Sequence, residues 1–144
     1  MKKIMLSMLL FIVTIGYSQE WKTNFEVAKT EATNQNKNIL LVFSGSDWCG
    51  PCIKLDRDIW KSAYFMEFAK NNLILERADF PKKKQNQLTP EIKELNQSLA
   101  EKYNKDGMFP LVVVVDKNGK VLGKTGYKNV SPQEYVNILK SFLK

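Results

Sequence analysis

The hydrophobic residues of this sequence occur in short continuous runs and in helical repeats, and the two patterns alternate along the chain. Residues 39–43 and 111–115 are uninterrupted apolar runs of strand-forming residues, which predicts two buried strands. Residues 73–79 and 121–127 each open with apolar residues and predict two further strands. Residues 117–120 contain an Asn-Gly pair, which is typical of a hairpin turn, so we expect the last two strands to be neighbours.

Five other segments carry apolar residues at three- or four-residue spacing, which predicts amphipathic helices. They are residues 21–36, 53–60, 62–71, 89–103 and a last helix that opens at 131–134. The expected order is therefore helix, strand, helix, helix, strand, helix, strand, strand, helix. This order describes one α/β domain without repeats or linkers.

Two of these helices open with recognisable start signals. Thr89, Pro90 and Glu91 supply an N-cap hydroxyl, a proline at the first helical position and an acid in the first turn. Ser131 and Glu134 have the spacing of a capping box. The helical residues that we expect to face the core are Phe25, Ala28, Ala32, Ile92, Leu95, Leu99, Tyr103, Tyr135, Ile138, Leu139 and Phe142.

The composition is that of a globular domain with a mild positive charge. Hydrophobic residues make up 44% and charged residues 26% of the 144 residues, enough for one domain with its own core. The formal net charge is +7, and the lysines are dispersed except at residues 82–84, so we expect a solvated surface and no nucleic-acid partner. The sequence has no histidine, which excludes Cys–His and Ser–His nucleophile pairs and the usual histidine-containing zinc sites.

Residues 1–18 have the pattern of a secretory signal peptide. Two lysines precede the largely apolar residues 4–15, and the small residues Gly16 and Ser18 follow. At about 12 residues, the apolar stretch is short for the roughly 20 that span a bilayer. We therefore expect export, cleavage after the signal, and a mature domain of residues 19–144 in the periplasm. An uncleaved N-terminal anchor is the alternative.

The two cysteines, Cys49 and Cys52, are separated by two residues and lie between a predicted strand and a predicted helix. A thiol at a helix N-terminus faces unpaired N–H groups and the positive end of the helix dipole, which favours the reactive thiolate. Cys52 should turn inward with Leu55 and Ile59, where burial favours the thiol. A plain structural disulfide is the alternative, although closing so short a loop adds little stability.

The sequence Trp-Cys-Gly-Pro-Cys at residues 48–52 resembles the active-site motif of the thioredoxin superfamily. The similarity extends to residues 45–55, 78–81 and 103–110, which resemble an exported bacterial branch, and it covers residues 21–144 in all. It implies a thioredoxin-like fold, a central mixed β-sheet flanked by helices, with a cis proline opposite the cysteine pair.

The resemblance also implies roles for the residues of the motif. Cys49, expected to be the more exposed cysteine, attacks a substrate disulfide as the nucleophile, and Cys52 resolves the mixed disulfide. Their redox-active disulfide is the only redox group expected, with no cofactor and no metal. Trp48 should shield one side of the site, Gly50 should let the turn fit closely, and Pro51 should stiffen the first helical turn. All three are expected to contact substrate.

Two further positions follow from the same resemblance. Pro110 matches the cis proline, and the backbone of Phe109 before it would pair with an extended substrate; a trans proline that merely starts a strand is the alternative. Many thioredoxins carry a buried acid six residues before the first cysteine, where this chain has Phe43. Proton transfer would then use water, the backbone or another side chain, such as Glu76 or Asp47.

The resulting hypothesis is a reductase of protein disulfides. The Gly-Pro dipeptide supplies no cation to stabilise the thiolate further. We therefore expect a reduction potential close to that of thioredoxin, which is about −270 mV. The expected partners are disulfide-bearing proteins and, by the resemblance, a membrane thiol transporter as electron donor, and the protein is expected to be a monomer. The alternatives are an exported oxidase or isomerase, a peptide-binding module with an inert disulfide, and a metal chaperone that would also need Met108 or ligands from a partner.

Overall fold

The computed structural model describes residues 20–143 of the chain. Its elements in chain order are β1 (Trp21–Lys22), α1 (Phe25–Gln35), β2 (Asn38–Ser44), α2 (Gly50–Leu55), the π-helical turn η1 (Asp56–Trp60), α3 (Ala63–Asn72), β3 (Leu73–Asp79), the 3₁₀ turn η2 (Lys84–Asn86), α4 (Pro90–Tyr103), β4 (Leu111–Val115), β5 (Val121–Thr125) and α5 (Pro132–Phe142). The predicted signal peptide, residues 1–18, lies outside the described residues. No helix within residues 20–143 is long and apolar enough to cross a membrane.

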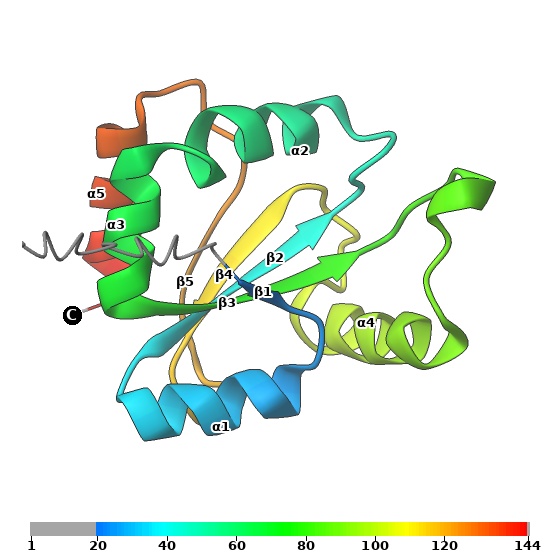
Figure 1. The fold of residues 1–144 in the computed structure, drawn as a ribbon, viewed down its shortest axis with the longest axis horizontal. Coiled ribbons are helices and arrows are strands. Elements are labelled where there is room, and N and C mark those ends of the chain that lie inside the picture. The colour runs from blue at the N-terminus through cyan, green and yellow to red at the C-terminus, as the bar shows by residue number, and fades with distance from the viewer. Residues whose placement is uncertain (1–19, 144) are drawn as a thin grey trace, which may run out of the picture.

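The five strands form one mixed sheet in the order β1-β3-β2-β4-β5. β1, β3 and β2 run parallel, whereas β4 is antiparallel to β2 and β5 is antiparallel to β4. Figure 1 shows α1 and α4 on one face of this sheet and α2, α3 and α5 on the other. Helices cover both faces of the inner strands β2 and β4, which explains the continuous apolar sequences of these two strands. The predicted α/β architecture with a central mixed sheet is confirmed.

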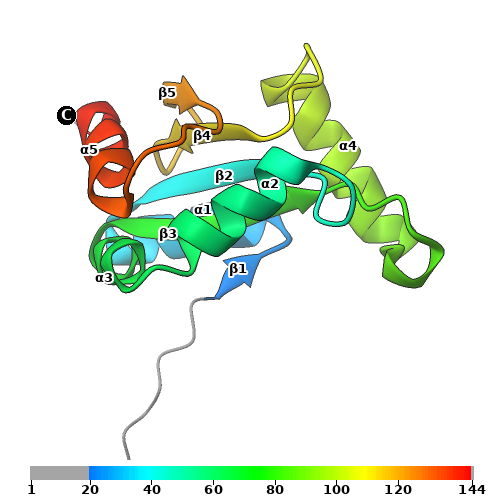
Figure 2. The ribbon, with the colours of Figure 1, turned by 90° about the horizontal axis from the view of Figure 1, so that it is seen from above.

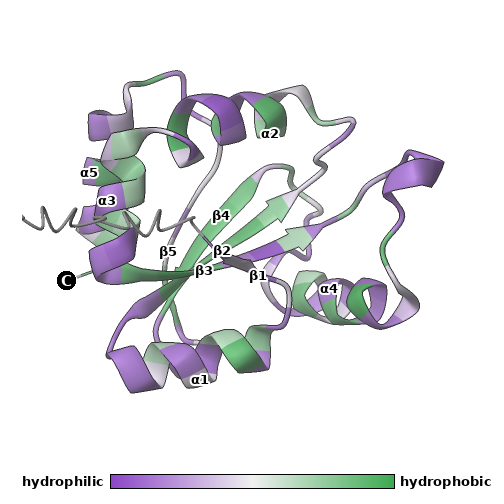
Figure 3. Ribbon diagram, viewed as in Figure 1, coloured by the Kyte–Doolittle hydropathy of each residue, from purple (hydrophilic) through white to green (hydrophobic). Residues whose placement is uncertain are grey.

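Alternate residues of the central strands enter two separate hydrophobic cores, because successive side chains of a strand point to opposite faces. Leu40 and Val42 of β2 pack into the core beneath α2, α3 and α5. Ile39, Leu41 and Phe43 pack into the core beneath α1 and α4. Figure 3 shows the resulting band of hydrophobic strands between helices with hydrophilic outer faces.

The first helix is shorter than the predicted residues 21–36. Trp21 and Lys22 instead form β1, which pairs in parallel with the edge of β3. The Asn24 side chain then accepts hydrogen bonds from two amides of the following turn, at 3.0 and 3.3 Å, so α1 begins at Phe25. A strand of two residues is too short to produce a periodic signal, and only its pairing with a distant strand defines it.

The helix after the cysteines departs from regular geometry. The predicted residues 53–60 are divided between the end of α2 and the wider turn η1. This turn buries the consecutive residues Ile59 and Trp60, each 2% exposed. Arg77 on β3 donates a 2.9 Å hydrogen bond to Asp56 at the start of the turn, which ties the turn to the sheet. Apolar residues at three- or four-residue spacing do not distinguish an α-helical turn from a π-helical one, so the periodicity predicted a regular helix here.

Two predicted helix faces are rotated slightly in the structure. In α4, Leu95 is 37% exposed, and Asn96 is buried instead because its side-chain amide donates to the backbone carbonyl of Asp79 at 2.9 Å. In α5, Val136 is fully buried, whereas the predicted Ile138 and Phe142 are only half-buried. The remaining predicted core positions of the helices are buried, except for the half-buried Ile92.

The predicted turn signals are present with one difference. The Ser131–Glu134 capping box forms as expected. In the β4–β5 turn, Gly119 has a φ of +85° and Asn118 does not take the left-handed conformation. The Asp116 carboxylate accepts hydrogen bonds from the amides of Asn118 and Lys120, at 2.8 and 3.0 Å, and stabilises this tighter arrangement. β5 ends at Thr125, before the predicted residue 127.

One acid, Glu76 on β3, is buried on the α1 face of the sheet. Its side chain has no exposed surface, and neither carboxyl oxygen has a hydrogen bond of good geometry among the described residues. Burial raises the pKa of Glu76 from 4.5 to about 8, and the nearby Asn24 amide and Lys22 ammonium oppose this rise without cancelling it. Glu76 is therefore mostly protonated in the folded protein at neutral pH.

We expect Glu76 to make the protein less stable as the pH rises. The unfolded chain releases this proton near pH 4.5 and the folded chain near pH 8, so the free energy of unfolding should fall between these values. Glu76→Gln should therefore be more stable than the wild type at pH 9 by about 2–4 kcal/mol, and nearly equal at pH 4.5. Urea unfolding at several pH values measures this, and identical pH profiles would contradict the assignment.

Candidate functional site

The cysteine pair lies at the start of α2, just after the turn that connects β2 to this helix. Cys49 and Cys52 form a disulfide, with their Cα atoms 5.2 Å apart. Cys49 is the N-cap of α2, and its Sγ atom accepts a 3.3 Å hydrogen bond from the Cys52 amide. The predicted position at a strand–helix junction is therefore confirmed. An amide that points at the first sulfur stabilises negative charge there when the disulfide opens.

The expected difference in exposure between the two cysteines is not seen in the disulfide form. Cys49 is 5% exposed and Cys52 is 4% exposed. Both sulfurs belong to the Cys49–Cys52 disulfide in this state. Cys52 faces inward together with Leu55 and Ile59, as predicted.

Trp48 stands beside the disulfide in a small aromatic group. Its indole N–H donates a 2.7 Å hydrogen bond to the carbonyl of Phe80. The Trp48 and Phe80 rings each meet the ring of Phe109 edge-on, with centroids 5.4 Å apart. Trp48 remains 39% exposed, so one side of its indole is open to a partner. The sequence singled out Trp48 and Phe109, but not Phe80, which joins them.

Gly45 and Gly50 differ in whether their surroundings leave room for a side chain. A Cβ atom on Gly50 would meet nothing within 4 Å outside its own helical turn, so no such contact requires glycine there, and its role in the turn stays a prediction. A Cβ atom on Gly45 would instead overlap the Trp48 indole. Pro51 occupies the first turn of α2 as predicted, and both Gly50 and Pro51 are exposed beside the disulfide.

Pro110 precedes β4 and follows a cis peptide bond from Phe109, as expected from the resemblance. Leu111, the next residue, pairs with Phe43 at the end of β2, which brings this corner close to the cysteine segment. The loop before it is held by the buried Asn104. Its side chain accepts from the Met108 amide at 2.8 Å and donates to the Met108 carbonyl at 2.9 Å. Asn104 is a supporting residue that the sequence analysis missed.

Asp47 and Asp79 fasten the site to the segment that follows β3. Asp47 accepts hydrogen bonds from the Lys82 and Lys83 amides and the Asn86 side chain, at 2.9, 3.0 and 3.0 Å. These bonds, the Lys82 amide first, lower the pKa of Asp47. The Asp79 carboxylate accepts from the amide and the hydroxyl of Ser46. The two aspartates therefore connect both sides of the site across more than 30 positions of the sequence.

The structure pairs neither of the acids proposed as proton carriers with a cysteine. Phe43, at the position of the usual acid, is fully buried in the α1–α4 core. Asp47 is held as an anion by its three donors. Glu76 lies against Lys22 and Asn24 on the α1 face of the sheet. Water or backbone groups remain as the route for the proton of Cys52.

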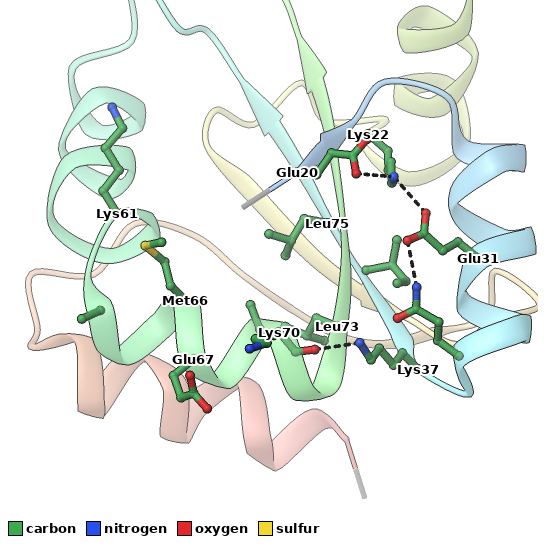
Figure 4. A pocket seen from close by; sticks show the side chains of 14 residues that line it. Glu20, Lys22, Glu31, Lys37, Lys61, Met66, Glu67, Lys70, Leu73 and Leu75 are labelled. Atoms are coloured by element: carbon green, nitrogen blue, oxygen red, sulfur yellow. Dashed lines mark hydrogen bonds and ion pairs between the residues drawn. The ribbon is translucent and has the colours of Figure 1, made fainter. Parts of the chain in front are cut away.

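A cavity of about 490 Å³ lies at the β1 edge between α1 and α3, away from the cysteines. Figure 4 shows its rim of paired polar groups, in which Lys22 joins Glu20 and Glu31, each at 2.9 Å, and Lys37 donates to the Lys70 carbonyl. None of the predicted site residues lines it. Within residues 20–143, no group of three or more cysteines and acids is arranged to hold a metal ion.

Comparison with known proteins gives a family and a similar solved structure. A family model described as thioredoxin-like matches residues 20–117. The chain is 37% identical over 125 residues to the disulfide bond reductase DsbH of Chlamydia pneumoniae, covering 87% of this chain and 73% of that protein. A solved structure of a DsbH oxidoreductase has a TM-score of 0.80 at 35% identity, covering 88% and 85% of the two chains. A disulphide isomerase of Xylella fastidiosa Temecula1, with a TM-score of 0.61 at 20% identity and coverage of 92% and 99%, shares the fold alone.

We expect Gly45→Ala to displace the Trp48 indole. The added methyl group overlaps the ring, so the free energy of unfolding should fall by about 1–3 kcal/mol, and the indole N–H signal in NMR spectra should shift as its bond to Phe80 is lost. Gly50→Ala is the matched control, because its methyl group enters open space and should leave this signal in place. An unchanged Trp48 signal in Gly45→Ala would show that this contact does not position the ring.

Proposed function

Because the chain belongs to the thioredoxin-like family, we propose that it reduces disulfides of other proteins through Cys49 and Cys52. The family and the disulfide at the helix start make the protein a thiol–disulfide oxidoreductase. The direction of electron flow, the roles of individual residues and the compartment are the parts that we propose. The observation that carries the proposal is the disulfide at the N-cap of α2, with the Cys52 amide directed at the Cys49 sulfur.

The reaction consists of two exchanges in sequence. The Cys49 thiolate attacks one sulfur of the substrate disulfide, forms a mixed disulfide and releases the other substrate sulfur as a thiolate, which takes up a proton. Cys52 then loses its proton and attacks the Cys49 sulfur, which frees the second substrate thiol. The substrate gains two electrons and two protons, and the protein is left with the Cys49–Cys52 disulfide.

The proposed direction rests on the residues between the cysteines and on one relative. Gly50 and Pro51 add no positive charge beside Cys49, so the reduced dithiol gains no extra stability of the kind that makes a strong oxidant. The Chlamydia pneumoniae relative is named a disulfide bond reductase. An oxidase or isomerase would use the same two sulfurs and differ in potential.

The substrate surface that we propose surrounds the disulfide. Trp48, Gly50 and Pro51 lie on one side, and the backbone of Phe109 next to Pro110 offers hydrogen-bonding groups to an extended segment. Each turnover leaves the protein oxidised, so it needs an electron donor, and we propose a membrane thiol transporter for this role. We propose that the protein acts as a monomer, with disulfide-bearing proteins as its substrates.

The reduction potential and insulin reduction test the proposed direction. We expect a potential near about −270 mV in glutathione or dithiothreitol buffers, and catalysed precipitation of insulin by dithiothreitol. A potential near about −120 mV would identify an oxidant and contradict the proposal. A disulfide without catalytic effect on insulin would favour the peptide-binding alternative.

The two single-cysteine variants are the controls for the mechanism. Cys52→Ser should react rapidly with alkylating reagents near neutral pH and accumulate mixed disulfides, because its nucleophile remains and its resolving thiol is lost. Cys49→Ser should react slowly at the same pH, since the helix N-cap position and the amide hydrogen bond that favour a thiolate belong to the Cys49 sulfur. Both should lose multiple-turnover reduction. Equal alkylation rates at pH 7 would overturn the assignment of Cys49 as the nucleophile.

We also propose that the protein is exported to the periplasm, because residues 1–18 have the charged start, apolar stretch and small residues of a signal peptide. Protein isolated from its natural source should begin near Gln19, and intact-mass spectrometry measures this directly. A mature protein that retains Met1 would contradict cleavage and favour an anchor.

A further inference from the structure

The segment between β3 and α4 forms a basic loop next to the disulfide. We call residues 80–88 the lysine loop; it contains Lys82, Lys83 and Lys84 and no acid. Figure 2 shows this loop extending beyond the ends of β2 and β3, beside the segment that leads into α2. Figure 3 shows that its outer part, around η2, is hydrophilic.

The lysine loop is fixed to the residues immediately before Cys49. The Phe80 amide donates to the carbonyl of Ser44 at 2.8 Å, and its carbonyl accepts the Trp48 indole N–H. Asp47 binds the loop at three points through its carboxylate. Within the loop, the Gln87 side chain donates to the Pro81 carbonyl at 3.0 Å. The loop therefore presents its lysines at a defined place beside the disulfide.

The positive charges of the loop are open to a partner. The ammonium of Lys82 lies 3.9 Å from the centroid of the Trp48 ring, and Lys82, Lys83 and Lys84 are all exposed. Within residues 20–143, no carboxylate forms an ion pair with any of the three ammonium groups. Asp47 interacts electrostatically with Lys83, but its oxygens accept hydrogen bonds from backbone amides and the Asn86 side chain.

We propose that the lysine loop binds acidic segments next to the target disulfide in protein substrates. The proposal rests on the proposed function and adds a substrate class to it. Trp48 directly precedes Cys49, and its exposed ring lies against Lys82, so a partner that contacts Trp48 also meets this charge. Fixed positive charges beside a reaction site attract acidic partners and raise their rate of association, an effect that salt weakens.

Two peptides, each with one disulfide, test this substrate class. In one peptide the residues that flank the disulfide are Asp and Glu, and in the other they are Asn and Gln. At low ionic strength we expect kcat/KM for the acidic peptide to exceed that for the neutral peptide by about tenfold, mainly through KM, and the ratio to approach one in 1 M salt. A ratio near one at low salt would overturn the proposal and leave the reductase function standing.

Charge-neutralising variants locate the effect. The triple variant Lys82→Gln, Lys83→Gln, Lys84→Gln should bring the acidic-to-neutral ratio close to one. The control variant removes the same number of charges at exposed positions on the β4–β5 turn and on α5, through Lys117→Gln, Lys120→Gln and Lys140→Gln. It should keep the wild-type ratio, and an equal loss in both variants would show a general charge effect and contradict a docking site in the lysine loop.

A binding experiment separates this proposal from the proposed function. Versions of the two peptides with serine in place of cysteine can be titrated into the oxidised protein while the Trp48 indole and lysine-loop amides are followed by NMR. The acidic peptide should shift these signals at about tenfold lower concentration than the neutral peptide, whether or not the protein proves to be a reductase. Equal shifts by both peptides would contradict the proposal. Signals that shift with a single-stranded oligonucleotide, but not with the acidic peptide, would also contradict the proposal and would identify a nucleic-acid site instead.

Discussion

The turn between β2 and α2 positions the whole site, and it depends on the close contact between Gly45 and the Trp48 indole. The Gly45 carbonyl accepts hydrogen bonds from the amides of Trp48 and Cys49, at 3.2 and 2.9 Å, which folds the chain back before the helix starts. Because residue 45 has no side chain, the indole can lie against it and still reach Phe80. This contact determines where the Cys49 sulfur lies relative to the segment that follows β3.

The sheet and the site are coupled at the same end of the strands. The parallel strands β2 and β3 end side by side, so the residues that follow them can meet although they are far apart in the sequence. Asp47 and Asp79 use this proximity to hydrogen-bond the opposite segment. The corner at Pro110 joins them through the pairing of Leu111 with Phe43. The segments after β2, after β3 and before β4 thus meet at one end of the sheet, around the residues that precede the cysteine pair.

The sequence predicted the features that depend on residues close together in the chain. The apolar runs identified the strands other than β1, and the Cys49–Cys52 spacing located the site. The sequence could not show β1, since a strand of two residues exists only through pairing with β3. The burial of Asn96 in place of Leu95 depends on a carbonyl 17 positions away. The lysine run was interpreted as an ordinary solvated surface, because the contacts that bring it to the site join residues 35 and 36 positions apart.

The covered sulfurs of the oxidised protein have a consequence for its selectivity. With Cys49 only 5% exposed, a small thiol from solution meets little of the sulfur surface that it must attack. A protein partner that docked on the proposed substrate surface would gain binding energy that a small thiol lacks, and this energy would help it to reach the disulfide. A small thiol such as dithiothreitol should therefore reduce this disulfide more slowly than it reduces a fully exposed one.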